Sequence, residues 1–123
     1  MEVVAVLGAS RDPSRYSYKA MQLLKEYGHE PVPVHPRESE VLGYPVVSEI
    51  KELVKLGKKI DTVTMYVNAA LSTKYLQDLI DLKPRRVIFN PGSENPSLEK
   101  ALVERGILVE EACTLVLLRT GQF

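Results

Sequence analysis

Val3-Val4-Ala5-Val6-Leu7-Gly8-Ala9-Ser10 is the segment from which the architecture of this chain follows. Its first five residues are apolar without interruption, which predicts a strand that is buried on both faces. Gly8 lets the backbone turn sharply, and helical spacing of apolar residues begins beyond the turn and continues to Gly28. A strand, a tight turn and a helix in this order predict the first half of a βαβ unit.

The helix that follows this turn has two candidate starts. Asp12-Pro13 is suited to an N-cap and a first turn, whereas Ser17 would cap a shorter helix and leave residues 9–16 as a loop. The apolar stripe expected on its inner face comprises Tyr16, Ala20, Leu23, Leu24 and Tyr27.

The same alternation of strand and helix continues to the C-terminus. Further strands are expected at residues 31–35, 60–67, 86–89 and 107–109, and helices at 48–56, 71–82 and 96–105, with a helical turn at 114–118. The pattern predicts an α/β protein with one domain, residues 1–123. Its fold is a Rossmann-like doubly wound parallel sheet of about five to six strands with helices on both faces.

Two prolines distinguish the second strand. Pro31 and Pro33 are two residues apart, so both missing N–H donors lie on one side of the strand. The valine side is therefore expected to pair with the first strand. The proline side is expected to meet only a stub of strand within residues 44–47.

Composition excludes several classes of function. Lys plus Arg and Asp plus Glu number 16 each in 123 residues, so the net charge of 0 argues against non-specific binding to nucleic acid or to a membrane surface. One cysteine cannot form an intramolecular disulfide, and two histidines do not complete a structural zinc site with it. We expect a reduced, cytoplasmic protein that holds no metal.

Ligands of doubly wound sheets bind beyond the carboxyl ends of the strands, so the first turn is a candidate anion site. Ser10 adds a hydroxyl close to the start of a helix, and Arg11, Arg15 and Lys19 add positive charge. The segment is not the G-x-G-x-x-G fingerprint, because Ser10 and Pro13 replace its second and third glycines. The alternative is a bare strand-to-helix turn with its arginines on a solvated face.

The end of the second strand separates the candidate nucleotides. A site for NAD has a carboxylate here that accepts from the ribose hydroxyls, whereas this chain has His35, Pro36 and Arg37. A cation suits a phosphate monoester on the ribose, as in coenzyme A or NADP. The alternative for Arg37 is a surface arginine paired with Glu38 or Glu40.

Two further segments follow the last two strands. Asn90-Pro91-Gly92 is either an ordinary turn or part of the binding edge, and Cys113 is the only thiol. Cys113 is either a small buried hydrophobe or a thiol that faces the pantetheine end of bound coenzyme A and forms a mixed disulfide with it.

Five motifs together carry a resemblance: Val6-Leu7-Gly8-Ala9-Ser10, Ser17-Tyr18, Val34-His35-Pro36-Arg37, Gly43-Tyr44-Pro45-Val46 and Tyr66-Val67-Asn68. With them the chain resembles the small stand-alone CoA-binding proteins, whose fold is that of the N-terminal domain of the succinyl-CoA synthetase α subunit. The resemblance implies a diphosphate at the Gly8–Ser10 turn, a phosphate-binding role for Arg37 and adenosine near the ends of the second and third strands. His35 stands where many relatives have asparagine.

The resemblance does not extend to ligase activity, because the synthetase needs a second domain with a phosphorylated histidine and a partner subunit. We expect a protein that binds coenzyme A or an acyl-CoA without catalysis. The competing hypotheses are a minimal NADP-binding oxidoreductase and a purely interaction-based protein. The apolar tail Leu115–Leu118 packs either inside the domain or against a second subunit, which leaves a homodimer open. The residues expected to contact the ligand are Gly8, Ala9, Ser10, Arg11, Ser14, Arg15, Tyr16, Ser17, His35, Pro36, Arg37, Tyr66, Val67, Asn68, Asn90, Gly92 and Cys113.

Overall fold

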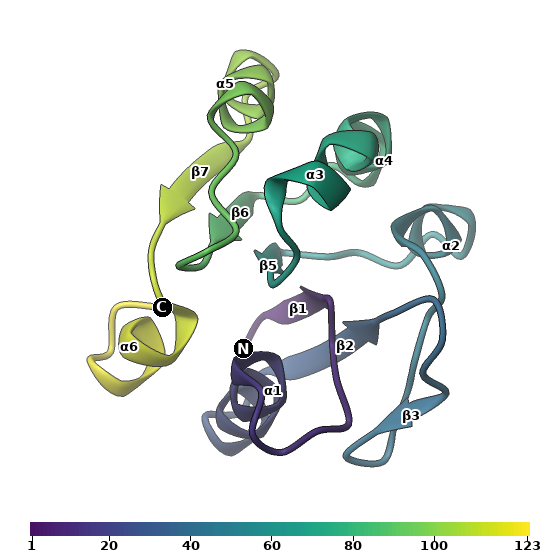
Figure 1. The fold of residues 1–123 in the computed structure, drawn as a ribbon, viewed down its shortest axis with the longest axis vertical. Coiled ribbons are helices and arrows are strands. Elements are labelled where there is room, and N and C mark those ends of the chain that lie inside the picture. Colours follow the sequence, from purple (N-terminus) through teal and green to yellow (C-terminus); the bar gives the residue numbers. More distant parts are fainter.

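The computed structural model describes residues 1–123, which form a five-stranded parallel sheet covered by helices on both faces (Figure 1). The strand order is β2-β1-β5-β6-β7. The strands are β1 (Val3–Leu7), β2 (Glu30–Val34), β5 (Thr62–Met65), β6 (Arg86–Phe89) and β7 (Leu108–Glu111). All four pairings are parallel. Because β2 lies on one side of β1 and the later strands lie on the other, the strand order reverses between β1 and β5. The predicted fold class is confirmed.

The helices divide between the two faces of the sheet (Figure 1). α1 (Tyr16–Glu26) and α6 (Thr114–Arg119) pack on one face together with a small hairpin of β3 (Glu40–Val41) and β4 (Tyr44–Pro45). The other face carries α2 (Ile50–Lys55), α4 (Leu76–Leu82) and α5 (Pro96–Glu104), and α4 is preceded by α3 (Ala69–Ser72) and the 3₁₀ turn η1 (Thr73–Tyr75). No helix has the length and apolarity that crossing a membrane requires.

β1 is apolar throughout because both of its faces are covered. Val4 and Val6 are fully buried in the cluster beneath α1, whereas Ala5 and Leu7 are buried in the cluster beneath α2, α4 and α5. Alternate residues of a strand point to opposite faces, so a strand between two helical layers needs an apolar residue at every position.

The prolines of β2 act as predicted. Val32 and Val34 lie opposite Ala5 and Leu7 of β1, and on the other side the strand meets only an isolated bridge to Val47. In this bridge the Val47 N–H donates to the Pro33 carbonyl and the His35 N–H donates to the Val47 carbonyl, both at 3.0 Å. Residues 44–45 do not join the sheet, because they pair with β3 instead.

The start and the inner face of α1 differ from prediction. The helix begins at Tyr16 with Arg15 as its N-cap, so neither Asp12-Pro13 nor Ser17 caps it. Ser17, Ala20, Met21 and Leu24 are the buried residues of its inner face, whereas Tyr16 and Tyr27 are 67% and 51% exposed. The physical reason is the helical phase, since the two tyrosines lie at the ends of the helix and off the stripe that contacts the sheet.

Two other predicted elements have different bounds. The helix expected over residues 71–82 is broken into α3, η1 and α4, and the strand expected over residues 60–67 ends at Met65. Asn95, in contrast, caps α5 as the Asn95-Pro96 pair predicts, because its side chain accepts from the Leu98 N–H.

Candidate functional site

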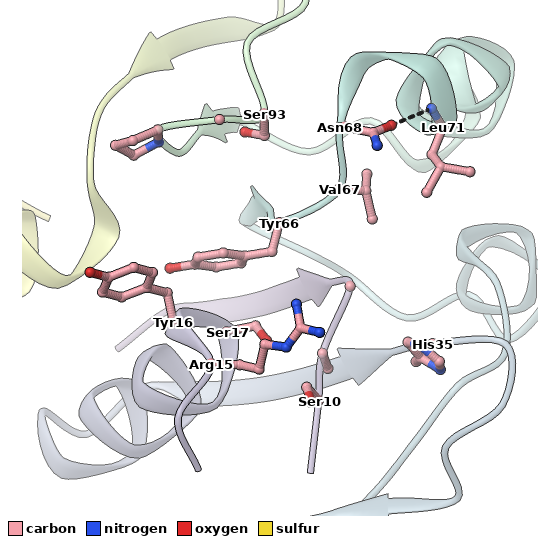
Figure 2. A pocket seen from close by; sticks show the side chains of 14 residues that line it. Ser10, Arg15, Tyr16, Ser17, His35, Tyr66, Val67, Asn68, Leu71 and Ser93 are labelled. Carbon is pink, nitrogen blue, oxygen red and sulfur yellow. Dashed lines mark hydrogen bonds between the residues drawn. The ribbon is translucent and has the colours of Figure 1, made fainter. Parts of the chain in front are cut away.

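A cavity of about 520 Å³ opens at the carboxyl edge of the sheet, where the strand order reverses (Figure 2). Turns from four parts of the chain and the first residues of α1 meet here. Its wall consists of Gly8, Ala9, Ser10, Arg15, Tyr16, Ser17, His35, Tyr66, Val67, Asn68, Leu71, Pro91, Gly92 and Ser93. This is the position at which doubly wound sheets bind their ligands.

Most of the residues predicted from the sequence come together in this wall. Eleven line the cavity: Gly8, Ala9, Ser10, Arg15, Tyr16, Ser17, His35, Tyr66, Val67, Asn68 and Gly92. Six do not: Arg11, Ser14, Pro36, Arg37, Asn90 and Cys113. The structure adds Leu71, Pro91 and Ser93. Pro91 and Ser93 lie in the same turn as Asn90 and Gly92, so their position next to predicted site residues could have identified them. Nothing in the sequence marks Leu71 as a site residue.

Gly8 brings the first turn close to the turn after β5. Its φ is +91°, and a Cβ at this position would lie 2.9 Å from the carbonyl oxygen of Tyr66. The N–H groups of Gly8 and Ala9 both donate to the Val34 carbonyl, at 3.0 and 3.2 Å. These two residues therefore shape the turn, and their N–H groups are already used by the fold.

The N-terminus of α1 supplies the free donors. The N–H groups of Tyr16 and Ser17 have no acceptor in the protein, as expected for the first turn of a helix. The Ser17 side chain is only 4% exposed, makes no hydrogen bond and lines the cavity. The Ser17 hydroxyl and the N–H groups of Tyr16 and Ser17 are therefore available to donate to a ligand in the cavity.

Arg15 is the one cation in the cavity wall, and its guanidinium points into the cavity (Figure 2). It takes part in no ion pair, and neither does Arg11. Lys19 lies elsewhere, with its Nζ 5.3 Å from the centre of the Tyr16 ring. The expected cationic cluster is thus Arg15 at the wall and Arg11 beside the turn.

Asp12 and Ser14 form a turn of their own between β1 and α1. The Ser14 N–H and hydroxyl donate to the same Asp12 carboxylate oxygen, at 2.9 and 2.8 Å. These two hydrogen bonds, more than the nearby Arg15 charge, hold the pKa of Asp12 below its ordinary value. The Ser14 hydroxyl is therefore used to hold Asp12 and does not line the cavity.

His35 fixes the turn after β2. Its Nδ1 accepts from the N–H groups of Arg37 and Glu38, at 3.0 and 3.2 Å, so the ring of the neutral side chain carries its proton on Nε2. The ring lines the cavity. An asparagine oxygen accepts from the N–H two residues ahead in the same way, which gives a physical reason why histidine can replace asparagine here.

Arg37 and Pro36 lie outside the cavity wall and are exposed. Arg37 forms no ion pair with Glu38 or Glu40, so the alternative of a paired surface arginine does not hold.

Asn90 has a structural role. It is 2% exposed, and its Nδ2 donates to the Thr64 hydroxyl and the Met65 carbonyl, at 2.7 and 2.9 Å. Its Oδ1 accepts from the Thr114 N–H at 2.9 Å. Both amide protons donate to β5 and the amide oxygen accepts from α6, so the amide protons are not available to a ligand.

Tyr66 and Cys113 lie near one another at the base of α6. Burial raises the pKa of Tyr66 to about 12, and the neighbouring hydroxyls of Thr114 and Thr64 offset this only in part. Its hydroxyl is buried without a well-formed hydrogen bond, while its ring lines the cavity (Figure 2). Cys113 is half-buried, is the N-cap of α6 and is not among the residues that line the cavity.

Curated relatives match part of the chain. It is 43% identical over 51 residues to the alpha subunit of the ADP-forming acetate–CoA ligase II of Pyrococcus furiosus. It is 38% identical over 50 residues to the uncharacterized protein YneT of Bacillus subtilis. Each segment is 41% of this chain, and they are 11% and 37% of these relatives.

Solved structures match nearly the whole chain. A crystal structure of an uncharacterized protein has a TM-score of 0.90 at 40% identity and covers 100% of this chain and 98% of that one. A protein of Thermus thermophilus has a TM-score of 0.87 at 31% identity, with 99% and 90% covered. The model of the CoA binding domain family matches residues 2–119. The chain therefore belongs to the CoA binding domain family.

Proposed function

We propose that this protein binds coenzyme A or an acyl-CoA in the cavity at the carboxyl edge of the sheet. The observation that carries this proposal is a group of unpaired donors in the cavity wall at the start of an eleven-residue helix, namely the N–H groups of Tyr16 and Ser17 and the Ser17 hydroxyl. A diphosphate oxygen would satisfy these donors, and the helix dipole favours its negative charge.

Charge and size agree with such a ligand. Coenzyme A carries about four negative charges near neutral pH, from a diphosphate and a phosphate monoester. Arg15 at the wall, with Arg11 and Arg37 beyond the rim, are cations without ion-pair partners. The volume of about 520 Å³ falls within the range of roughly 300–1,000 Å³ that is usual for small-molecule sites.

Family membership supports the choice of coenzyme A over other phosphorylated nucleotides. We assign no catalytic step to this chain. The ligase activity for which the Pyrococcus furiosus relative is named belongs to that protein, of which the matched segment is 11%.

Calorimetric titration with CoA, dephospho-CoA, NADP and NAD tests the proposal. We expect CoA to bind most tightly. Tighter binding of NADP than of CoA would favour the oxidoreductase hypothesis instead, and no binding of any of the four would leave the interaction-based protein.

Ser17→Ala tests the diphosphate site. A hydrogen bond to a charged group contributes about 1.5–3 kcal/mol, so the variant should bind CoA at least tenfold more weakly. Without ligand it should be as stable as the wild type or more so, because the Ser17 hydroxyl makes no hydrogen bond within the protein and alanine has the higher helix propensity. Ser39→Ala, at an exposed serine without side-chain hydrogen bonds, is the matched control. An unchanged CoA affinity in Ser17→Ala would contradict this placement.

Arg37→Ala tests the phosphate monoester. If the exposed guanidinium of Arg37 contacts the 3′-phosphate, the variant should lose more affinity for CoA than for dephospho-CoA. Equal losses would mean that Arg37 does not contact the monoester.

A further inference from the structure

A carboxylate of the chain itself lies beside the proposed phosphate site. The Oε2 atom of Glu38 accepts from the Arg11 N–H at 2.9 Å, and this is the one side-chain hydrogen bond between the loop after β1 and the loop after β2. The backbone of Glu38 is held in turn, because its own N–H donates to Nδ1 of His35 at 3.2 Å. Ser10 and His35, the cavity-lining residues nearest to this contact in sequence, are labelled in Figure 2.

The N–H of Arg11 stands out among the donors of the first turn. The N–H groups of Gly8 and Ala9 donate to the Val34 carbonyl, and that of Asp12 donates to the Ser10 hydroxyl. Of these N–H groups, that of Arg11 alone donates to an anion, the Glu38 carboxylate. A carboxylate oxygen on a backbone N–H makes the same charge-assisted hydrogen bond that a phosphate oxygen would make.

The cations around Glu38 strengthen this comparison. Arg11 is one partner of this contact, and Arg37 directly precedes the other partner, Glu38, in the sequence. Neither guanidinium forms an ion pair with Glu38 or with any other acid. Glu38 is thus placed by its hydrogen bond to the backbone, and the two guanidinium groups stay free for a second anion.

We propose that Glu38 is a resident anion of the site, which competes with the phosphate monoester of an incoming nucleotide for the loop after β1. The inference rests on the proposed function and concerns which ligands the site prefers. A monoester that approaches Arg37 must either displace the Glu38 carboxylate from the Arg11 N–H or bind within a few ångströms of it. Both routes lower the affinity for a 3′-phosphorylated ligand more than for one that lacks this phosphate.

Glu38→Gln isolates the charge, because glutamine keeps an oxygen that can accept from the Arg11 N–H. In a dielectric close to that of water, a phosphate monoester with a charge of about −1.5 to −2 that lies about 5–6 Å from a carboxylate is repelled enough to change an affinity by roughly five- to tenfold. We therefore expect Glu38→Gln to bind CoA about five- to tenfold more tightly than the wild type, and dephospho-CoA less than twofold more tightly. This increase in CoA affinity should become smaller as the salt concentration rises, because salt screens the repulsion.

Glu40→Gln is the matched control, since it removes the same charge from an exposed residue that has no contact with Arg11. It should change either affinity less than twofold. Thermal unfolding of both variants without ligand checks that neither substitution destabilises the fold as a whole.

The outcomes separate this inference from the proposed function. If the wild type binds CoA and Glu38→Gln binds CoA and dephospho-CoA with equal changes or none, the inference is wrong and the proposed function stands. Weaker CoA binding by Glu38→Gln would show that the carboxylate contacts the ligand favourably, which also overturns it. If neither protein binds CoA or dephospho-CoA, both proposals fail together. Binding of CoA by Glu38→Gln alone would support the inference.

Discussion

Gly8→Ala should be among the most damaging single-methyl changes in this protein. The Cβ of an alanine at this position would lie 2.9 Å from the Tyr66 carbonyl oxygen, 3.0 Å from Cγ1 of Val67 and 3.1 Å from the Tyr66 carbonyl carbon. Two of these atoms are backbone, so they cannot move aside without shifting the turn after β5. The φ of +91° adds a separate penalty for any residue with a Cβ.

The magnitude is the sum of two effects. A positive φ costs a non-glycine residue roughly 1–2 kcal/mol, and forcing an additional methyl group into a packed site costs typically about 1–3 kcal/mol. The free energy of unfolding should therefore fall by about 2–5 kcal/mol. At roughly 4 °C per kcal/mol for a domain of this size, Tm should drop by about 8–20 °C.

Gly92→Ala provides the matched control. Gly92 has the same φ of +91°, but a Cβ there meets nothing within 4 Å. It should carry only the cost of the positive φ, about 1–2 kcal/mol or roughly 4–8 °C. Urea and thermal unfolding of the two variants measure the difference. If Gly8→Ala and Gly92→Ala lose the same stability within about 0.5 kcal/mol, the close approach of Gly8 to Tyr66 contributes nothing and the reasoning is refuted.

Three further predictions follow from contacts described above. Asn90→Ala removes three buried hydrogen bonds and leaves the Thr114 N–H without its partner, so urea unfolding should show a loss of about 2–4 kcal/mol; a loss below about 1 kcal/mol would contradict the structural role. Burial lowers the pKa of His29 below its ordinary 6.5, so the stability that its neutral form contributes is present above pH 6.5 and is lost as the pH falls through the lowered value. His29→Gln should therefore lose less stability between pH 7.5 and 5.5 than the wild type does, and equal losses in urea unfolding would argue against it. Incubation with CoA disulfide should add a CoA mass that dithiothreitol removes and that Cys113→Ser lacks, because Cys113 lies close to Tyr66, whose ring lines the cavity; an unmodified wild type in the mass spectrum would end this idea and leave reversible binding untouched.

Elements governed by local chemistry were predictable from the sequence. The double burial of β1 follows from its five apolar residues, and the one-sided pairing of β2 follows from Pro31 and Pro33. The position of the cavity follows from the parallel order of the strands, since turns from separate units must meet at one edge.

Long-range geometry was not predictable in the same way. Asn90 reads as part of a turn, and its partners Thr64 and Thr114 are 26 and 24 residues away. Glu38 was considered only as a partner of Arg37, because neighbours in sequence are the pairs that a sequence suggests. Its actual contact with the Arg11 N–H spans 27 residues and depends on how two loops approach each other.

The prolines of β2 also limit how this sheet can grow. Without N–H groups at Pro31 and Pro33, and with the His35 N–H taken by Val47, the outer side of β2 offers no free donor to an incoming strand. β7 is then the single edge strand of this sheet to which another chain could add by strand pairing. Because each molecule has one such edge strand, pairing of two molecules through β7 leaves neither with a free edge. Fibre-like extension by this route therefore stops at a pair.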